Sequence, residues 1–278
     1  MSTNKTWFIT GASKGFGLLF VQQLLAKGDN VAATTRSIAS LEAAAGIHPN
    51  LLALEVDLTS EESVATAINA TIAKFGRLDV VVNNAGYGLI GALEELSDAE
   101  SRANFEVNVF GLLNVIRQAM PHLREQKSGH IFNISSIGGF TGGFPGFGIY
   151  CATKFAVSGL TEALAVEAKD FGINVTLVLP GYFRTNFLNP DSLVVPKNTI
   201  AAYQSTRESQ AAHQNQINGN QAGDPEKGVA EIIKVADAPN PPLYLFLGSD
   251  AVSVAHNKIA ALDAEIAEWR SVSVSTDF

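Results

Sequence analysis

The chain has 278 residues, of which 46% are hydrophobic and 17% are charged. This length and composition predict a single α/β domain with a well-filled core and exclude a disordered chain. The formal net charge of −8 argues against nucleic acid as a partner, because phosphate binding relies on a basic surface.

Short apolar runs alternate with longer segments of helical period, a pattern typical of repeated βα units. Seven near-continuous apolar strands and six helices indicate a doubly wound parallel sheet of the Rossmann-like class, with helices on both faces and one domain over residues 1–278. The predicted strands are residues 6–10, 30–35, 51–57, 80–83, 130–135, 174–179 and 242–247. The predicted helices are residues 14–27, 37–45, 60–75, 98–126, 150–171 and 249–270.

A glycine-rich loop links the first predicted strand to the first helix. Gly11, Gly15 and Gly17 permit a tight turn, a close backbone approach to a pyrophosphate and close helix packing, while the helix N-terminus offers free N–H groups. Ser13 adds a hydroxyl donor. The position between a strand and a helix favours a dinucleotide site over a plain glycine-rich turn.

The end of the second strand indicates which dinucleotide is preferred. Thr34, Thr35 and Arg36 end this strand without an acid that would bind an adenosine ribose and repel a 2′-phosphate. Arg36 offers a planar fork for that phosphate, and Lys14 is a second cation. We therefore predict NADP(H) rather than NAD, the alternative being that both residues are solvated surface charges.

Tyr150 and Lys154 lie four residues apart in a predicted helix, a spacing that places both on one face. A free phenol ionises near pH 10, and a nearby ammonium together with an oxidised nicotinamide ring would lower that pKa toward neutrality. A surface pair without function is the alternative interpretation. A carbonyl that accepts hydride needs a proton donor and a second hydrogen-bond donor, so we assign Tyr150 and Ser136 to these roles, with Ser135 as a rival for the serine.

Residues 186–224 break the βα pattern, being rich in polar residues and interrupted by prolines. The segment follows the carboxyl end of a strand, where open α/β sheets bind ligands, so we predict a substrate lid. An ordinary surface excursion is the alternative.

Several of these motifs together resemble the short-chain dehydrogenase/reductase family, and the resemblance covers nearly the whole chain. They occur in family order: residues 10–17, Asp57-Leu58, residues 83–86, Asn108, Ser136, Tyr150 with Lys154, and Pro180-Gly181 with Thr185. The resemblance implies that Asp57 binds the adenine amino group, that Thr185 holds the nicotinamide carboxamide, and that Asn108 holds a water that relays protons to Lys154. The implied cofactor-binding residues are Gly11, Ser13, Lys14, Gly15, Phe16, Gly17, Arg36, Asp57, Leu58, Asn84, Ala85, Gly86, Tyr150, Lys154, Pro180, Gly181, Phe183 and Thr185.

The chain departs from the family in the loop at residues 138–148, which holds one residue more than usual between Ser136 and Tyr150. Phe140, Phe144 and Phe187 lie near the predicted reacting centre and indicate an apolar or aromatic substrate, although they are alternatively packing residues. The neighbouring motifs resemble the branch that includes hydroxysteroid-type and retinol-type reductases.

We therefore predict an NADP(H)-dependent oxidoreductase that interconverts a ketone or aldehyde and an alcohol. A non-catalytic NADP(H)-binding sensor or scaffold, and a dehydratase or epimerase on the same fold, are the alternatives. With one cysteine, no Cys/His cluster, no signal-peptide pattern and no membrane-length apolar run, we expect a cytoplasmic protein without a metal or membrane partner. Helices 98–126 and 150–171 are candidates for a homodimer or homotetramer interface, or else only cover the sheet.

Overall fold

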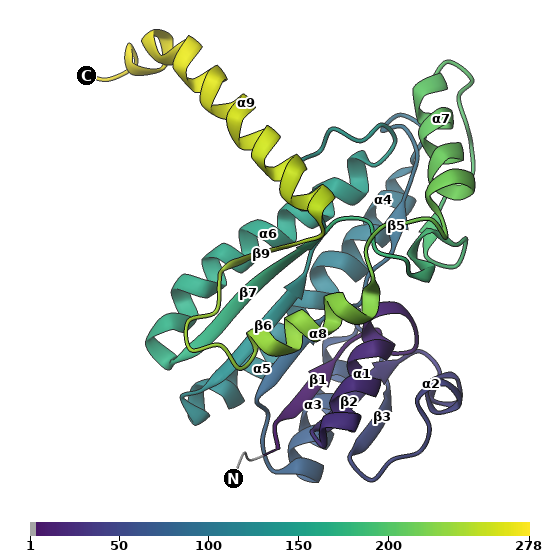
Figure 1. The fold of residues 1–278 in the computed structure, drawn as a ribbon, viewed down its shortest axis with the longest axis vertical. Coiled ribbons are helices and arrows are strands. Elements are labelled where there is room, and N and C mark those ends of the chain that lie inside the picture. Colours follow the sequence, from purple (N-terminus) through teal and green to yellow (C-terminus); the bar gives the residue numbers. More distant parts are fainter. Residues whose placement is uncertain (1–3) are drawn as a thin grey trace.

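The computed structural model describes residues 4–278, which contain a seven-stranded parallel sheet with helices on both faces (Figure 1). The strand order is β3-β2-β1-β4-β6-β7-β9, so the order reverses beside β1. The predicted doubly wound parallel sheet is confirmed. Its strands are β1 (Thr6–Ile9), β2 (Asn30–Thr35), β3 (Leu51–Glu55), β4 (Val80–Asn83), β6 (Gly129–Ile134), β7 (Ile173–Pro180) and β9 (Tyr244–Leu247).

Alternate side chains of each strand enter two separate cores. Trp7 and Ile9 of β1 pack with α1 (Gly15–Lys27), α2 (Ile38–Ala45) and α8 (Pro225–Val235). Phe8 faces the other way, toward α3 (Glu61–Phe75), α5 (Leu112–Gln126) and α6 (Gly148–Ala168). Because both faces are covered, most strand residues are apolar, which is why the strands were predictable.

Helix α8 was absent from the prediction, which assigned no helix to residues 225–235. Proline is favoured in the first turn of a helix, and here Asp224 caps the helix by accepting from the N–H groups of Glu226 and Lys227. Val229 and Ile232 then pack into the core beside α1. The helix supplies the crossover between β7 and β9.

The helix predicted over residues 98–126 contains three segments. They are α4 (Asp98–Phe105), a π-helical segment η1 (Glu106–Gly111) and α5. Asn108 lies in the π-helical segment, a kind of distortion often found at functional sites. The last predicted helix is α9 (Ser249–Val274), which extends past its predicted end and projects away from the sheet (Figure 1).

The segment 186–224 contains regular structure that the sequence pattern did not predict. It holds η4 (Asn186–Leu188), β8 (Leu193–Val194), α7 (Gln204–Ala212) and a π-helical η5 (His213–Ile217). Strand β8 pairs with the short β5 (Gly88–Leu89). The buried Glu95 carboxylate accepts from the N–H groups of Ala92 (2.8 Å) and Ile200 (2.7 Å) and forms an ion pair with Arg207, so it ties this segment to residues 88–100.

The length and composition of helix α6 resemble those of a membrane-spanning helix. Of the described residues, only Gly148–Phe171 forms a helix long and apolar enough to cross a membrane by length and composition. Its side chains Val157 and Leu164 are buried in the same core as Phe8. This packing is that of a helix that covers a sheet.

Glu95→Gln tests how firmly the segment is held. Removing one charge of a buried pair leaves Arg207 poorly compensated, so we expect trypsin to cleave after Lys197 or Arg207 about tenfold faster in the native protein. Glu94→Gln is the matched control, because Glu94 bonds only the exposed Tyr203 hydroxyl. Equal cleavage rates for the two variants would contradict this role of Glu95.

Candidate active site

A cavity of about 710 Å³ opens at the carboxyl ends of the parallel strands, with segment 186–224 along one side. Open α/β sheets bind ligands at this edge, beside the point where the strand order reverses. Most of the predicted residues line it. They are Gly11, Ser13, Lys14, Gly15, Phe16, Arg36, Asp57, Leu58, Asn84, Ala85, Gly86, Ser136, Phe144, Tyr150, Lys154, Pro180, Gly181, Phe183, Thr185 and Phe187.

Three predicted residues do not line the cavity. Gly17 and Asn108 are buried behind it. Phe140 turns into the core, where its ring packs edge-on against Phe246 at 5.2 Å between centroids. The prediction of Phe140 as a substrate residue is therefore wrong, because the loop's backbone path directs this aromatic side chain inward.

The glycine loop has the shape of an anion cradle. A Cβ on Gly11, whose φ is +67°, would lie 2.9 Å from the Ala85 Cα, and a Cβ on Gly17 would lie 2.2 Å from the Gly11 carbonyl oxygen. Only glycine fits at either position. Helix α1 starts without a side-chain cap at Lys14 and without an acidic residue in its first turn, so its N–H groups remain available to a phosphate. These residues fit a dinucleotide pyrophosphate.

Thr10 and Asn84 hold the loop in this shape. The Asn84 amide donates to the carbonyl oxygens of Thr10 (2.9 Å) and Gly11 (3.1 Å). The Thr10 hydroxyl accepts from the backbone N–H groups of Asn84 and Ala85, both at 3.0 Å. The Asn84 side chain thus braces the cradle, besides lining the cavity.

The charged residues predicted for the adenosine end lie around the ends of β2 and β3. Arg36 is exposed at the edge of the cavity. Asp57 accepts from the hydroxyl (2.7 Å) and the N–H (2.9 Å) of Thr59, and these hydrogen bonds lower the pKa of its carboxyl. The Lys14 ammonium donates to the Asp191 carbonyl at 3.4 Å, so this side chain contacts segment 186–224.

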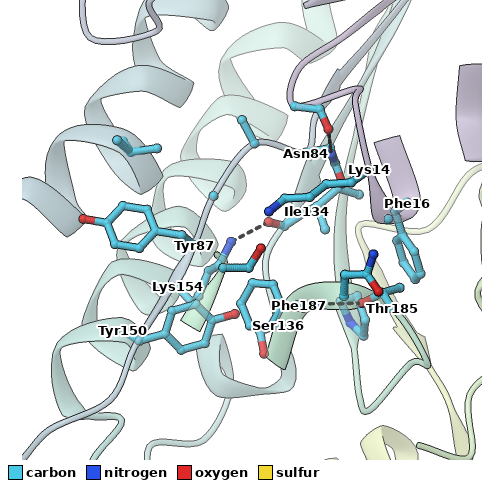
Figure 2. A pocket seen from close by; sticks show the side chains of 18 of the residues that line it. Lys14, Phe16, Asn84, Tyr87, Ile134, Ser136, Tyr150, Lys154, Thr185 and Phe187 are labelled. Carbon is cyan, nitrogen blue, oxygen red and sulfur yellow. Dashed lines mark hydrogen bonds between the residues drawn. The ribbon is translucent and has the colours of Figure 1, made fainter. Parts of the chain in front are cut away.

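Tyr150, Lys154 and Ser136 converge at the other end of the cavity (Figure 2). The Lys154 ammonium donates to the Ile134 carbonyl at 2.9 Å and lies 5.9 Å from the centre of the Tyr150 ring. The rival Ser135 is buried, and its hydroxyl donates to the Lys154 carbonyl at 3.1 Å. Ser136, beside the phenol, is the better-placed serine, and the longer glycine loop does not separate it from Tyr150.

Burial dominates the protonation of both groups. Burial raises the pKa of the Tyr150 phenol, and the hydrogen bond with the Ser136 hydroxyl lowers it by a smaller amount. Burial lowers the pKa of Lys154 from 10.5 to about 8. In the protein without cofactor, removing the phenolate from water outweighs its neighbours. The predicted lowering of the Tyr150 pKa also requires an oxidised nicotinamide ring, and it stays a prediction.

Asn108 locks the turn of α6 that carries Tyr150. Its amide donates to the Tyr87 carbonyl (3.0 Å) and to the Thr153 hydroxyl (3.1 Å), while its carbonyl accepts from the Tyr87 N–H (3.0 Å). The Thr153 hydroxyl in turn donates to the Tyr150 carbonyl at 2.7 Å. The Asn108 side chain is therefore committed to protein partners, and its proton-relay role stays a prediction.

Tyr182, His213 and Phe147 also line the cavity and were not among the predicted site residues. The His213 Nδ1 lies 2.7 Å from the Ser209 carbonyl, so it carries the proton, and Nε2 accepts from the Tyr182 hydroxyl at 2.8 Å. The Phe147 ring lies 4.7 Å from the imidazole. Phe147 belongs to the loop at residues 138–148, whose aromatic side chains were a signal for the substrate site. His213 lies in segment 186–224, where no sequence pattern indicated a site residue.

The short chain dehydrogenase family model matches residues 5–193. The chain belongs to this family. Oxidoreductase BOA17 of Botryotinia fuckeliana is 36% identical over 274 residues, 98% of this chain and 99% of that protein. Retinol dehydrogenase 8 of Bos taurus is 32% identical over 255 residues, 86% of this chain and 80% of that protein, in agreement with the predicted branch.

Solved structures agree with the family and with its cofactor class. A short-chain dehydrogenase from Streptomyces avermitilis has a TM-score of 0.90 at 38% identity, covering 99% of this chain and 100% of that one. ElxO with NADP bound has a TM-score of 0.73 at 30% identity, covering 90% of this chain and 100% of that one. This short-chain dehydrogenase is thus an oxidoreductase of the type that uses a nicotinamide nucleotide.

Lys154→Met tests the cost of burying the ammonium. Between pH 8 and pH 10.5 the unfolded chain keeps the Lys154 proton while the folded chain loses it, so wild-type stability rises with pH relative to the variant. The lowered pKa predicts that the difference in the free energy of unfolding between wild type and variant changes by about 3 kcal/mol across that window. Below pH 8 this difference is constant.

The measurement is urea unfolding of both proteins from pH 7 to pH 10.5. Lys169→Met is the matched control, since Lys169 is exposed just beyond the end of α6. A pH-independent difference between wild type and Lys154→Met would show that Lys154 is charged in the folded protein throughout.

Proposed function

We propose that this short-chain dehydrogenase is an NADP(H)-dependent reductase that interconverts a ketone or aldehyde and an alcohol. The observation that supports it is the placement of Tyr150, Ser136 and Lys154 in the same cavity as the glycine cradle. A proton donor and an anion cradle in one cavity are what hydride transfer from a bound dinucleotide to a carbonyl requires.

Each residue has a separate part in the reaction. A nicotinamide nucleotide held by the glycine cradle would supply the hydride for the carbonyl carbon. Tyr150 gives its proton to the carbonyl oxygen, and the Ser136 hydroxyl donates a second hydrogen bond to that oxygen. The adjacent Lys154 ammonium stabilises the phenolate until solvent returns the proton. One carbonyl, one NADPH and one proton yield one alcohol and one NADP⁺.

The preference for NADP(H) rests on the end of β2. Arg36 stands at the cavity edge, and its fork suits the 2′-phosphate of the cofactor. No carboxylate follows Thr35 in the chain at the position that would repel this phosphate. Lys14, which also lines the cavity, adds a second cation.

The substrate end favours a small apolar or aromatic carbonyl compound. Tyr150 lies within 5.8 Å of Phe187 and 6.1 Å of Phe147, between ring centroids. Phe144 and Leu188 extend this apolar wall. Because Phe187 and Leu188 belong to segment 186–224, we propose that this segment is the substrate lid.

We propose a cytoplasmic location, which fits a chain whose one cysteine is buried and free. We also propose that the protein is a homodimer or homotetramer, because η1 and α6 carry exposed apolar side chains. Phe110, Phe155 and Val166 are 46%, 44% and 76% exposed. Large apolar side chains gathered on two neighbouring helices favour contact with the same helices of a second copy.

Tyr150→Phe tests the proposed acid. We expect kcat/KM for NADPH-dependent reduction to fall about 10³-fold, with NADPH binding unchanged, because the ring remains and only the proton donor is lost. NADPH oxidation is measured over a panel of aromatic, steroid and aliphatic carbonyls, and NADPH binding by calorimetry. Tyr244→Phe, which changes an exposed tyrosine of β9 outside the cavity lining, is the control.

Near-normal turnover by Tyr150→Phe would refute the assignment of the acid. Binding of NADPH without its oxidation by any compound of the panel would favour the sensor interpretation. Conversion of a hydroxylated substrate without net NADPH consumption would favour a dehydratase or epimerase.

Arg36→Asp tests the cofactor preference. An acid at this position repels the 2′-phosphate and accepts from a ribose hydroxyl, so we expect the NADPH-to-NADH ratio of kcat/KM to fall at least about 100-fold. Arg124→Asp on α5 removes an exposed arginine that does not line the cavity and serves as the control for net charge. An unchanged ratio would exclude Arg36 as the phosphate ligand.

A further inference from the structure

Helix α9 begins inside the fold and ends outside it. Near its base, Asp250 accepts from the Tyr182 N–H at 2.7 Å, and Ala251 and Ala255 are buried against Ile137. From Ile259 onward every residue is exposed, and the helix projects from the body of the molecule to the C-terminus (Figure 1). We call residues 258–274 the arm.

The arm carries an apolar stripe with no covering among the described residues. Ile259, Leu262, Ile266 and Trp269 are 52%, 40%, 67% and 59% exposed. Their spacing of three, four and three residues is the heptad pattern of a coiled coil. A single helix about 26 Å long is only marginally stable in water without packing, so this stripe needs a partner.

We propose that the arm is an interaction surface that pairs with the arm of a second copy of this chain. The charges beside the stripe favour such self-pairing. In a parallel pair, Lys258 of one copy faces Asp263 of the other, and Glu265 faces Arg270. In the antiparallel pair that aligns the whole stripe, with Ile259 opposite Trp269, Asp263 faces Arg270 but Glu265 faces its own copy, so the charges favour the parallel pair.

A lipid surface is a poorer occupant of the same stripe. Residues 258–278 contain four acidic residues and two basic ones, whereas helices that lie on anionic membranes carry mainly Lys and Arg on the polar face. A narrow stripe at heptad positions also fits one facing helix better than a broad bilayer surface. The arm interface is separate from the one proposed for η1 and α6, and it is independent of the catalytic proposal.

The test compares molecular mass by sedimentation equilibrium over a concentration series of the full chain. In the Ile259→Glu/Ile266→Glu variant, charges enter the paired stripe, so we expect the arm's association constant to fall at least about 100-fold and the mass to drop to half that of wild type. Ala260→Glu/Ala267→Glu adds the same charge to the same helix one position along, off the stripe, and keeps the wild-type mass.

Equal masses for wild type and the Ile259→Glu/Ile266→Glu variant at every concentration would overturn the proposal, whatever that mass is. Flotation with phosphatidylcholine–phosphatidylserine vesicles serves as a second readout. If wild type binds the vesicles, the Ile259→Glu/Ile266→Glu variant does not, and the two have the same mass in solution, then the arm is a lipid-binding surface instead. Thermal unfolding, monitored by circular dichroism, tests whether the variants keep the fold.

Discussion

Lys154 places an ammonium group inside the protein, and the surrounding structure holds it there. Burial lowers the pKa of Lys154 to about 8, and its ammonium donates to the carbonyl of Ile134 at the end of β6. Such a group costs stability, which the packing of α6 on the sheet through Val157 and Leu164 offsets. The catalytic geometry therefore depends on one helix being fixed against one strand end.

Hydrogen bonds between distant parts of the chain fix the remaining geometry. Asn108 joins the loop at Tyr87 to the turn of α6 at Thr153, and Asn84 joins the end of β4 to the glycine loop. Side chains that a motif would assign to ligand binding thus also act as braces. Preorganised donors cost no rearrangement when charge develops on a substrate, which is why such bracing serves catalysis.

The base of α9 connects the arm to the substrate end of the cavity. Asp250 accepts from the backbone of Tyr182, whose hydroxyl meets His213 of segment 186–224. Ala251 and Ala255 press on Ile137, next to Ser136. The base of α9 therefore packs against residues that lie on two sides of the substrate end of the cavity.

The sequence by itself determined the sheet, because strands covered on both faces are mostly apolar, and it determined the glycine cradle and the spacing of Tyr150 and Lys154. Those features depend on near neighbours in the chain. Only the tertiary structure decided that Ser136 rather than Ser135 adjoins the phenol, that Phe140 packs inward, and that burial raises the Tyr150 pKa. Side-chain direction and desolvation depend on residues far away in sequence, which no local pattern records.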